Sequence, residues 1–481
     1  MEYTAALGEH KRALAGVLLK KMQAQFAPAS ALQYGQGKWY PGEPFPRWAL
    51  GCFWRPDGKP VWQDQQWLAE DGKDYGLTEQ DAKRFTEALS HSLGISSTYV
   101  RAGYEDRLYY LWKESNQPPN VDWLTLNLRD SKHRNDLVLS LQRGLDTATG
   151  YALPLSWSYE HQRWTGTPWY FRREEMYLIP GNSPMGFRLP LDSLVWTSET
   201  ERDVENQPCP FEDREPLPDF HEEATKTASA TEPLKEKEPL YASWYDIPRT
   251  AICIEVRQGR LHVFLPPLNY LEHYLDLLAH LEQTAAKLKM PIMLEGYEPP
   301  SDPRLKSFKI TPDPGVIEVN IHPATDWASL VANTEVLYEL ARESRLGTEK
   351  FMLDGRHTGT GGGNHVTMGA ATPIDSPFLR RPDLLRSLLT YWQHHPGLSY
   401  LFSGMFIGPT SQAPRVDEAR NESLYELEIA FQQMPDGESN QPWLVDRLLR
   451  NLLVDITGNT HRSEFCIDKL YSPDSFSGRQ G

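Results

Sequence analysis

The sequence predicts an α+β protein in three parts, and three observations lead to this prediction. Residues 1–197 hold 11 of the 15 tryptophans and contain both helix-like and strand-like patterns. Residues 198–240 hold 13 acidic residues, five basic residues and six prolines, with no Trp or Tyr. From residue 243 onward, strand and helix patterns alternate. We therefore expect a Trp-rich α+β unit (1–197), an acidic Pro-rich linker (198–242) and a second folded unit (243–481).

In the first unit, helices and one hairpin are expected. An apolar residue at every fourth position predicts a helix along Leu14, Leu18, Met22 and Phe26. The segments 49–54 and 59–62, joined by Pro56-Asp57-Gly58, predict a β-hairpin. Further helices are expected at 78–89 and near 136–145. We expect most tryptophans in the core rather than in a ligand groove, since large aromatic side chains are mostly buried.

The linker carries a formal charge of −8, half of the total of −16. Such a segment cannot bury enough apolar surface to offset the entropy lost on ordering, so we expect it to be disordered.

The second unit is expected to contain a hairpin, further strands and several helices. Residues 250–257 and 260–265 flank Gln258-Gly259 and predict a β-hairpin. Apolar periodicity predicts a helix at 271–288. Further strands are expected at 291–294, 307–310, 315–323, 351–354 and 366–369, and further helices at 327–344, 381–394 and 444–454.

The strand at 315–323 carries a candidate site. Alternation places Ile317, Val319 and Ile321 on one face, which we expect in the core. It places Glu318, Asn320 and His322 on the other face, about 6–7 Å apart. A carboxylate, an amide and an imidazole so arranged can hold a cation or a polar substrate. A half-solvated strand is the alternative interpretation.

A glycine-rich segment at 354–365 carries a second candidate site. Its four glycines between 359 and 363 allow the backbone to approach a ligand closely. The segment lacks the GK[ST] of a P-loop and the GxGxxG of a dinucleotide-binding turn. His365, at its end, is a candidate metal ligand, and Arg356 can contact a phosphate through two nitrogens. A flexible surface turn is the alternative.

Two weaker clusters follow. In 458–469, Arg462 and Glu464 would share a strand face, either in a site or in a salt bridge. In 408–430, Arg415 is a candidate anion ligand, and Glu426 and Glu428 would share a face of a strand at 425–430.

Composition excludes several classes of protein. The net charge of −16 argues against a general nucleic-acid binder. We find no run of 18 apolar residues and no secretory leader, so we expect neither a membrane span nor export. The four cysteines lie far apart without CxxC spacing, which favours a reducing cytoplasm and excludes a zinc ribbon.

Several longer strings resemble a large bacterial family of unknown function, in which this domain usually follows a transglutaminase-like domain. The family has been proposed to consist of carboxylate–amine ligases with the glutamine synthetase fold. The resemblance runs over nearly the whole chain, and the strings that carry it are 35–44, 357–365, 376–383, 399–404 and 410–418.

The resemblance implies a glutamine-synthetase-like antiparallel sheet or half-barrel with flanking helices in 243–481. It also implies ATP and Mg²⁺ as cofactors and a peptide or other carboxylate and amine as substrates. The residues implied for the metal are Glu255, Glu318 and His365. Together with the patterns above, it gives Gly361, Gly362, Gly363, Asn364 and Arg415 as candidates for ATP binding, and Arg356, Arg462 and Glu464 as candidates for phosphoryl transfer.

Two departures from the family pattern are expected to matter. We expect the chain to start inside the longer family architecture, after the transglutaminase-like domain. We also expect relatives to continue beyond residue 481 into a strand with a metal-binding Glu and a substrate-binding Arg. We therefore expect a truncated form, with doubtful activity in isolation.

The leading hypothesis is thus an ATP- and Mg²⁺-dependent amide-bond-forming ligase that acts through an acyl phosphate. One alternative is a transglutaminase-type cysteine acyltransferase that uses Cys52 or Cys466. Another is a non-catalytic scaffold that binds a peptide or glycan through the Trp-rich part.

Overall fold

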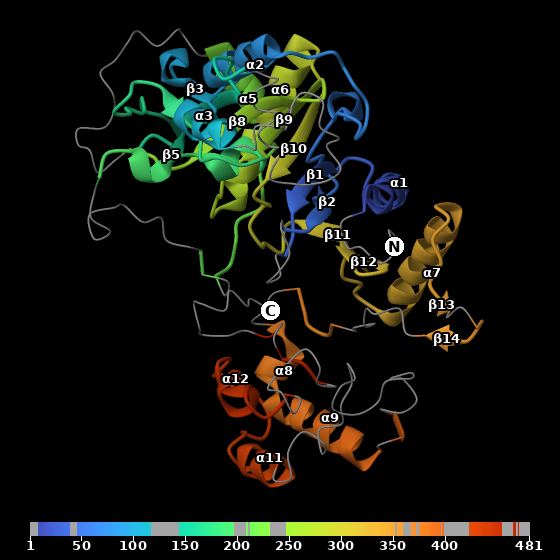
Figure 1. Ribbon diagram of the computed structural model, residues 1–481. Helices are drawn as coiled ribbons and strands as arrows, with labels where there is room; N and C mark the ends of the chain where they lie inside the picture. The colour runs from blue at the N-terminus through green and yellow to red at the C-terminus, as the bar shows by residue number, and fades with distance from the viewer. Residues whose placement is uncertain are drawn as a thin grey trace.

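One mixed sheet of ten strands organises the computed structural model (Figure 1). The structure describes residues 8–38, 46–116, 144–196, 208–209, 212–230, 247–351, 354–358, 367–371, 375–395, 397–398, 423–454, 465–467 and 470. The strands of the sheet are β1 (Ala31–Gln36), β2 (Trp48–Trp54), β3 (Arg101–Tyr104), β4 (Gly150–Pro154), β7 (Met176–Tyr177), β8 (Ala251–Arg257), β9 (Arg260–Leu265), β10 (Ile292–Gly296), β11 (Lys306–Asp313) and β12 (Val316–Asn320). Their order is β12-β11-β2-β1-β10-β9-β8-β4-β3-β7.

Most neighbouring strands are antiparallel, but β1–β10, β10–β9 and β3–β7 pair in parallel. Two small sheets pair β5 (Ser156–Ser158) with β6 (Arg163–Thr165) and β13 (Lys350–Phe351) with β14 (His357–Thr358). The described helices are α1 (Glu9–Phe26), α2 (Glu79–Ser92), α3 (Arg107–Ser115), α5 (Phe220–Ala230), α6 (Leu271–Leu288), α7 (Trp327–Glu343), α8 (Pro377–Arg380), α9 (Pro382–His394), α11 (Ser423–Gln432) and α12 (Leu444–Leu449). Short 3-10 turns are η2 (Gln65–Trp67), η3 (Ser97–Tyr99), η4 (Met185–Arg188) and η5 (Leu191–Ser193). The predicted α+β class is confirmed.

The helices cover opposite faces in the two halves of the sheet. Helices α2, α5 and α6 pack on the side to which Leu294 of β10 points, in one apolar core. Helix α1 packs on the side to which the preceding residue, Met293, points, in a second core. Because successive side chains alternate along a strand, these cores lie on opposite faces. We call the first the α6 face and the second the α1 face; Figure 1 shows α6 over β9 and β10 and α1 beside β1 and β2.

Helices α8, α9, α11 and α12 form a separate group around their own apolar core (Figure 1). Its centre contains Leu385 and Leu389 of α9, Leu427 of α11 and Val445 of α12. No helix among the described residues is long and apolar enough to cross a membrane.

Several predicted elements are confirmed. The amphipathic helices at 14–26, 78–89, 271–288 and 327–344 are present as α1, α2, α6 and α7, and 381–394 and 444–454 contain α9 and α12. The hairpin at 250–265 is β8 and β9, joined by a two-residue turn in which Gln258 and Gly259 both have positive φ. The strands at 291–294, 307–310 and 315–323 are present as β10, β11 and β12.

Three predicted elements are wrong. Strand β2 pairs with β1 and β11 and not with 59–62, which contains no strand. Residues 425–430 lie in helix α11, whose buried Leu427, Ala430 and Met434 follow helical spacing. The described residues 367–369 form no strand, and the helix expected at 136–145 lies almost entirely outside the described residues.

The expected disorder of the linker is wrong for residues 212–230. This segment forms α5 and buries Leu217, Phe220 and Ala224 in the core shared with α6. The expected boundary between residues 1–197 and 243–481 also does not coincide with the sheet. Strand β4 pairs with β8 and β1 pairs with β10, so strands from both parts share one sheet.

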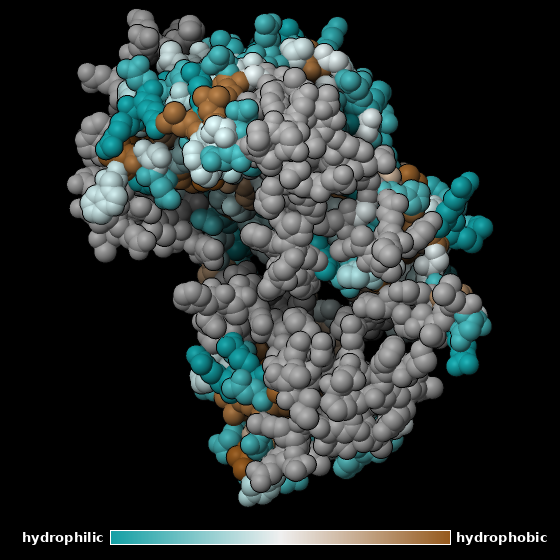
Figure 2. Space-filling model, viewed as in Figure 1, coloured by the Kyte–Doolittle hydropathy of each residue, from teal (hydrophilic) through white to brown (hydrophobic). Residues whose placement is uncertain are grey.

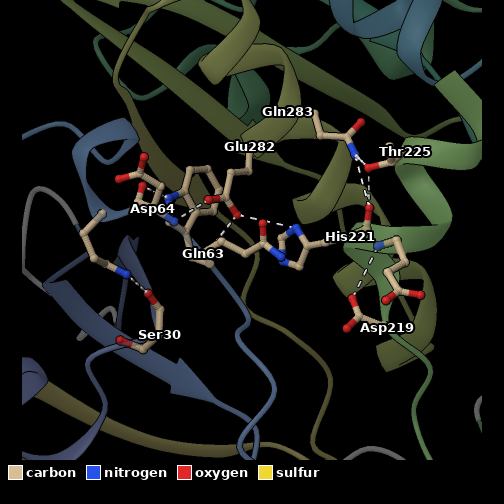
Figure 3. A network of polar contacts seen from close by, with 11 residues as sticks. Ser30, Gln63, Asp64, Asp219, His221, Thr225, Glu282 and Gln283 are labelled. Atoms are coloured by element: carbon tan, nitrogen blue, oxygen red, sulfur yellow. Dashed lines mark hydrogen bonds and ion pairs between the residues drawn. The ribbon is translucent and has the colours of Figure 1, made fainter. Parts of the chain in front are cut away.

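A buried carboxylate on α6 anchors this segment and one loop (Figure 3). Glu282 accepts hydrogen bonds from the backbone N–H groups of Gln63, at 2.9 Å, and Asp64, at 2.6 Å. His221 of α5 places its Nδ1 3.7 Å from the same carboxylate. Burial raises the pKa of Glu282 to about 7, although the two N–H groups oppose this rise. Burial lowers the pKa of His221, so at neutral pH this contact involves a neutral imidazole.

Gly296 is expected to be essential at the end of β10. Its φ is 93°, and a Cβ there would lie 2.6 Å from the carbonyl oxygen and 2.7 Å from the nitrogen of Leu265. We expect Gly296→Ala to lower the free energy of unfolding by about 3 kcal/mol, because strain and overlap add. Gly72, with φ 85° and open space around it, is the matched control, and Gly72→Ala should cost only about 1 kcal/mol. Urea unfolding measures both; equal losses would contradict the overlap with Leu265.

The raised pKa of Glu282 predicts a pH dependence. Its folded pKa lies above the ordinary value of 4.5, so between these values the folded state binds more protons and loses stability as the pH rises. The stability of the wild type relative to Glu282→Gln should therefore fall by about 1–3 kcal/mol from pH 5 to pH 7.5. Urea unfolding across this range checks the prediction, with the exposed Glu335→Gln as control. A constant difference between wild type and Glu282→Gln would reject it.

Candidate functional site

Three charged side chains and one histidine gather on the α1 face at the centre of the sheet. Glu255 and Arg257 come from β8, His262 from β9 and Glu295 from β10. In β8 they alternate with Ile252, Ile254 and Val256, which face α6. Glu255 and His262 are direct partners across the hairpin. We call these four residues the charged cluster.

Arg257 connects the two carboxylates of the cluster. Its Nη2 donates a hydrogen bond to Glu295, and its Nε lies 3.5 Å from Glu255 Oε1. His262 Nδ1 lies 3.4 Å from Glu295 Oε2. The backbone N–H of Met185, in η4, donates to Glu255 Oε1 at 2.9 Å. One guanidinium therefore compensates two carboxylates in an almost closed environment.

Burial and the opposite charges within the cluster together determine which of its side chains are ionised. Glu255 and Glu295 are each 5 % exposed and His262 is 7 % exposed. Burial would raise the pKa of Glu295, but the charge of Arg257 outweighs it and keeps that pKa below the ordinary value. Burial lowers the pKa of His262, so its imidazole is neutral at pH 7. Burial also opposes the charge of Arg257, but the two carboxylates raise its pKa and keep it charged.

Some polar atoms of the cluster have no hydrogen-bond partner in the described part of the chain. They are Glu295 Oε1, His262 Nδ1, His262 Nε2 and Arg257 Nε. A carboxylate oxygen and a neutral imidazole can accept a proton or hold the N–H of a ligand. The cluster therefore has unused capacity for a polar ligand.

An irregular segment, rather than a helix, borders the cluster. Met176, Leu178 and Met185 pack beside β4, β8 and β9 in a third apolar core. Arg188 fixes this segment through its buried salt bridge to Glu105 and a hydrogen bond to the carbonyl of Ile179. Beyond the cluster, the rings of Phe187, Phe264 and Tyr297 meet with centroids 4.7–6.0 Å apart.

The structure does not bring the predicted metal ligands Glu255 and Glu318 together. Glu318 is exposed on β12, opposite Thr311, on the α6 face. Its neighbours Ile317 and Val319 pack on the α1 face, as predicted for the apolar side of this strand. Glu255 lies on the α1 face of β8, with five strands between β8 and β12. One ion cannot contact both carboxylates in this arrangement.

The expected polar face of Glu318, Asn320 and His322 is also not formed. Strand β12 ends at Asn320, and the chain then turns. His322 lies on the α1 face between Phe26 and Trp54, with ring centroids 4.9 and 5.2 Å away. Its Nε2 is 3.1 Å from Asn333 Nδ2. Strand periodicity fails here because the strand is shorter than the pattern.

The other predicted site residues divide into two groups. Arg356 lies before β14, with 82 % of its side chain exposed, and pairs with Asp354 at 3.3 Å. The remaining residues lie outside the described part of the chain: Gly361, Gly362, Gly363, Asn364, His365, Arg415, Arg462 and Glu464.

Cys52 is unsuited to act as a nucleophile. It is buried beneath α1, and burial raises the pKa of its thiol to about 12. The thiol is therefore protonated at neutral pH, whereas nucleophilic attack requires the thiolate. Cys466, the other candidate, is partly exposed, and His461, the nearby histidine in the sequence that would activate its thiol, lies outside the described residues.

Tryptophans of the first part divide between core and surface. Trp62, Trp164 and Trp169 are buried, in line with the expected core role. Trp112 of α3 is 65 % exposed, together with Leu108 and Leu111 on the same helix. Figure 2 shows apolar surface around α3 in the upper left of the view.

Arg257, His262 and Glu295 were not among the residues that sequence patterns singled out. The signal was nevertheless present, because each is a charged or polar residue within an otherwise apolar strand. Alternation marks them as sharing one face, as it did for 315–323. What the pattern lacks is the information that β8, β9 and β10 are neighbours in the sheet.

Comparison with protein families gives a match over residues 2–481, to a family described as "Putative amidoligase enzyme (DUF2126)". The searches of curated proteins and of solved structures found no match.

The ion pairs of Arg257 predict strong coupling with Glu295. Arg257→Met should lower the free energy of unfolding by about 3 kcal/mol, because two buried carboxylates lose their cation. Arg257→Met/Glu295→Met should cost at least about 1 kcal/mol less than the sum of the single variants. Arg356→Met is the matched control, since its pair is exposed and should change stability by about 0.5 kcal/mol or less. Additive effects of the Arg257 and Glu295 variants in urea unfolding would refute the coupling.

Proposed function

The chain belongs to the DUF2126 family, whose description names an amidoligase, and from this premise we propose that it is an ATP-dependent carboxylate–amine ligase. In the proposed reaction a carboxylate oxygen of one substrate attacks the γ-phosphorus of ATP. An acyl phosphate forms and ADP leaves. The nitrogen of an amine then attacks the acyl carbon, phosphate leaves and the amine loses one proton, which completes an amide bond.

The observation that carries the proposal is the charged cluster. A ligase of this kind must hold an anionic substrate and remove a proton from an amine. Arg257 is a buried cation that can hold an anion, because guanidinium groups bind carboxylates and phosphates well. His262 is buried and neutral, so it can accept the proton of the amine. Both groups lie on the same face of adjacent strands.

The described residues do not by themselves fit a Mg²⁺ ion. No three His, Cys, Asp or Glu side chains converge within the described part of the chain. Glu255 and Glu295 are already balanced by Arg257, whereas Mg²⁺ prefers anionic oxygens that it does not share with a cation. We therefore derive no step through the metal. We keep Mg²⁺ in the proposal as the partner of ATP, with His365, which lies outside the described residues, as the ligand to be tested.

Further parts of the proposal rest on sequence patterns and on the family resemblance. They are phosphate contacts from Arg356, Arg415, Arg462 and the glycines of 361–363, a peptide substrate, and a transglutaminase-like partner domain. The glutamine-synthetase-like form of the sheet belongs to the same group.

A non-catalytic binding role has one supporting observation. Leu108, Leu111 and Trp112 expose an apolar side of α3 within the Trp-rich part. A scaffold of this kind would bind a peptide or glycan without ATP. The experiment below therefore separates the two functions.

Calorimetry with ATP tests the ligase proposal. The wild type should bind ATP in the presence of Mg²⁺ and much more weakly with EDTA. His365→Ala should weaken binding about tenfold, the effect typical of altered metal ligation. Glu255→Gln should also weaken binding, because it removes one of the two carboxylates that hold Arg257 in the charged cluster. Glu318→Gln is the matched control and should leave binding unchanged, because Glu318 lies on the opposite face of the sheet.

Hydroxylamine provides a second measurement, because it traps an acyl phosphate as a hydroxamate. Hydroxamate should form only with ATP and a carboxylate substrate, in a panel that includes peptides with free carboxyl groups. A folded wild type that binds no ATP would reject the ligase proposal. A loss of ATP binding in Glu318→Gln equal to that in Glu255→Gln would contradict the assignment of Glu255.

A further inference from the structure

Two arginines face each other at the hairpin end of the charged cluster. Arg257 ends β8 and Arg260 begins β9, and the two residues are direct cross-strand partners. They lie on the same face as Glu255 and His262, since alternate residues of each strand share a face. Side chains at such positions have Cβ atoms about 4.5–5.5 Å apart, and like charges there destabilise a sheet.

Arg260 lacks the compensation that Arg257 has. Its side chain is buried, with the residue 8 % exposed, and its Nε has no hydrogen-bond partner within the described residues. Its Nη2 donates to the neutral side-chain amide of Gln258. Glu255 and Glu295 both pair with Arg257 and not with Arg260. A buried charge that no salt bridge compensates is costly.

We propose that Arg257 and Arg260 together form an oxyanion-binding site whose natural ligand is a carboxylate or phosphoryl group of the substrates. A guanidinium presents its N–H groups in a planar fork, which matches two oxygens of either group. A bound oxyanion would supply the negative charge that Arg260 lacks. It would also satisfy Arg260 Nε, which has no hydrogen-bond partner within the described residues.

The site places a substrate anion beside the proton acceptor of the proposed reaction. His262 is two residues after Arg260 on the same face of β9. Same-face neighbours along a strand are about 6–7 Å apart. The identity of the anion rests on the proposed ligase function, but the existence of the site does not, because an inorganic anion can occupy it without ATP.

Arg260→Met tests the site through thermal unfolding of the full chain. In buffer without phosphate or carboxylate, this variant should unfold about 2 °C higher than the wild type, because an uncompensated buried charge is replaced by an apolar side chain. Sodium phosphate or sodium acetate, at matched ionic strength against chloride, should raise the unfolding temperature of the wild type. The unfolding temperature of Arg260→Met should not rise with either anion.

Two further variants keep the test decisive. Lys287→Met removes one positive charge from the exposed side of α6 and should respond to anions like the wild type. Arg260→Lys keeps the charge but loses the planar fork, and its anion response should be weaker than that of the wild type. A rise with phosphate alone identifies a phosphoryl site, and a rise with acetate alone identifies a carboxylate site.

A general stabilising effect of phosphate on proteins would appear equally in all four proteins. That result, or the absence of any rise in the wild type, overturns the proposal. So does an unfolding temperature of Arg260→Met below that of the wild type, with an unchanged anion response, since Arg260 would then be structural. Because no ATP is present, the anion site and the ligase function can fail independently.

Discussion

The parallel pairing of β1 with β10 is the contact on which the arrangement of the sheet depends. It joins segments that are far apart in the sequence, and Gln33 secures it from the α6 face. The Gln33 side chain donates to the carbonyls of Gly296, at 3.2 Å, and Tyr297, at 2.8 Å, and accepts from the hydroxyl of Tyr274 at 3.1 Å. Gly35 and Gly296 lie close together at the same ends of the two strands. Strands of the first part also meet strands after residue 250 at the β4–β8 and β2–β11 edges, but β1–β10 is the pairing that joins the two halves of the sheet.

The same pairing explains where a polar cluster can exist. In the half of the sheet that contains β8, β9 and β10, α6 covers one face. In the half that contains β1, β2 and β11, α1 covers the opposite face. The α1 face of β8 and β9 is therefore left to the irregular segment that contains η4. Open α/β sheets bind ligands where the covering helices change sides, at the carboxyl ends of parallel strands. Glu295, one residue before the end of β10, lies at such a place.

Sequence patterns predicted the elements that depend on residues close together in the chain. Amphipathic helices such as α6 and the β8–β9 hairpin follow from apolar spacing and turn residues within a few positions. The alternation in 425–430 suggested a strand, but packing of Leu427, Ala430 and Met434 favours a helix. The low apolar content of 212–230 suggested disorder, but a few contacts with α6, with Glu282 at their centre, are enough to order it.

The candidate site was predictable only in part, for a physical reason. The family resemblance identified Glu255 as a residue of interest, and alternation placed Glu318 on the polar side of its strand. Alternation does not show on which face of the sheet the polar side of a strand lies, because this depends on strand partners elsewhere in the chain. Glu295 and His262 become neighbours of Glu255 only through the order β10-β9-β8.

The central position of β1 and β2 also has a consequence for folding during synthesis. These two strands pair with each other locally, but their outer neighbours, β10 and β11, lie about 260 residues further along the chain. At about 5–20 residues per second, a ribosome needs roughly 13–50 s to deliver them. For that time both edges of the β1–β2 pair lack their final partners, and unpaired strand edges are prone to join other chains. Both edges of the β1–β2 pair therefore stay without their final partners until residues 292–313 have been made.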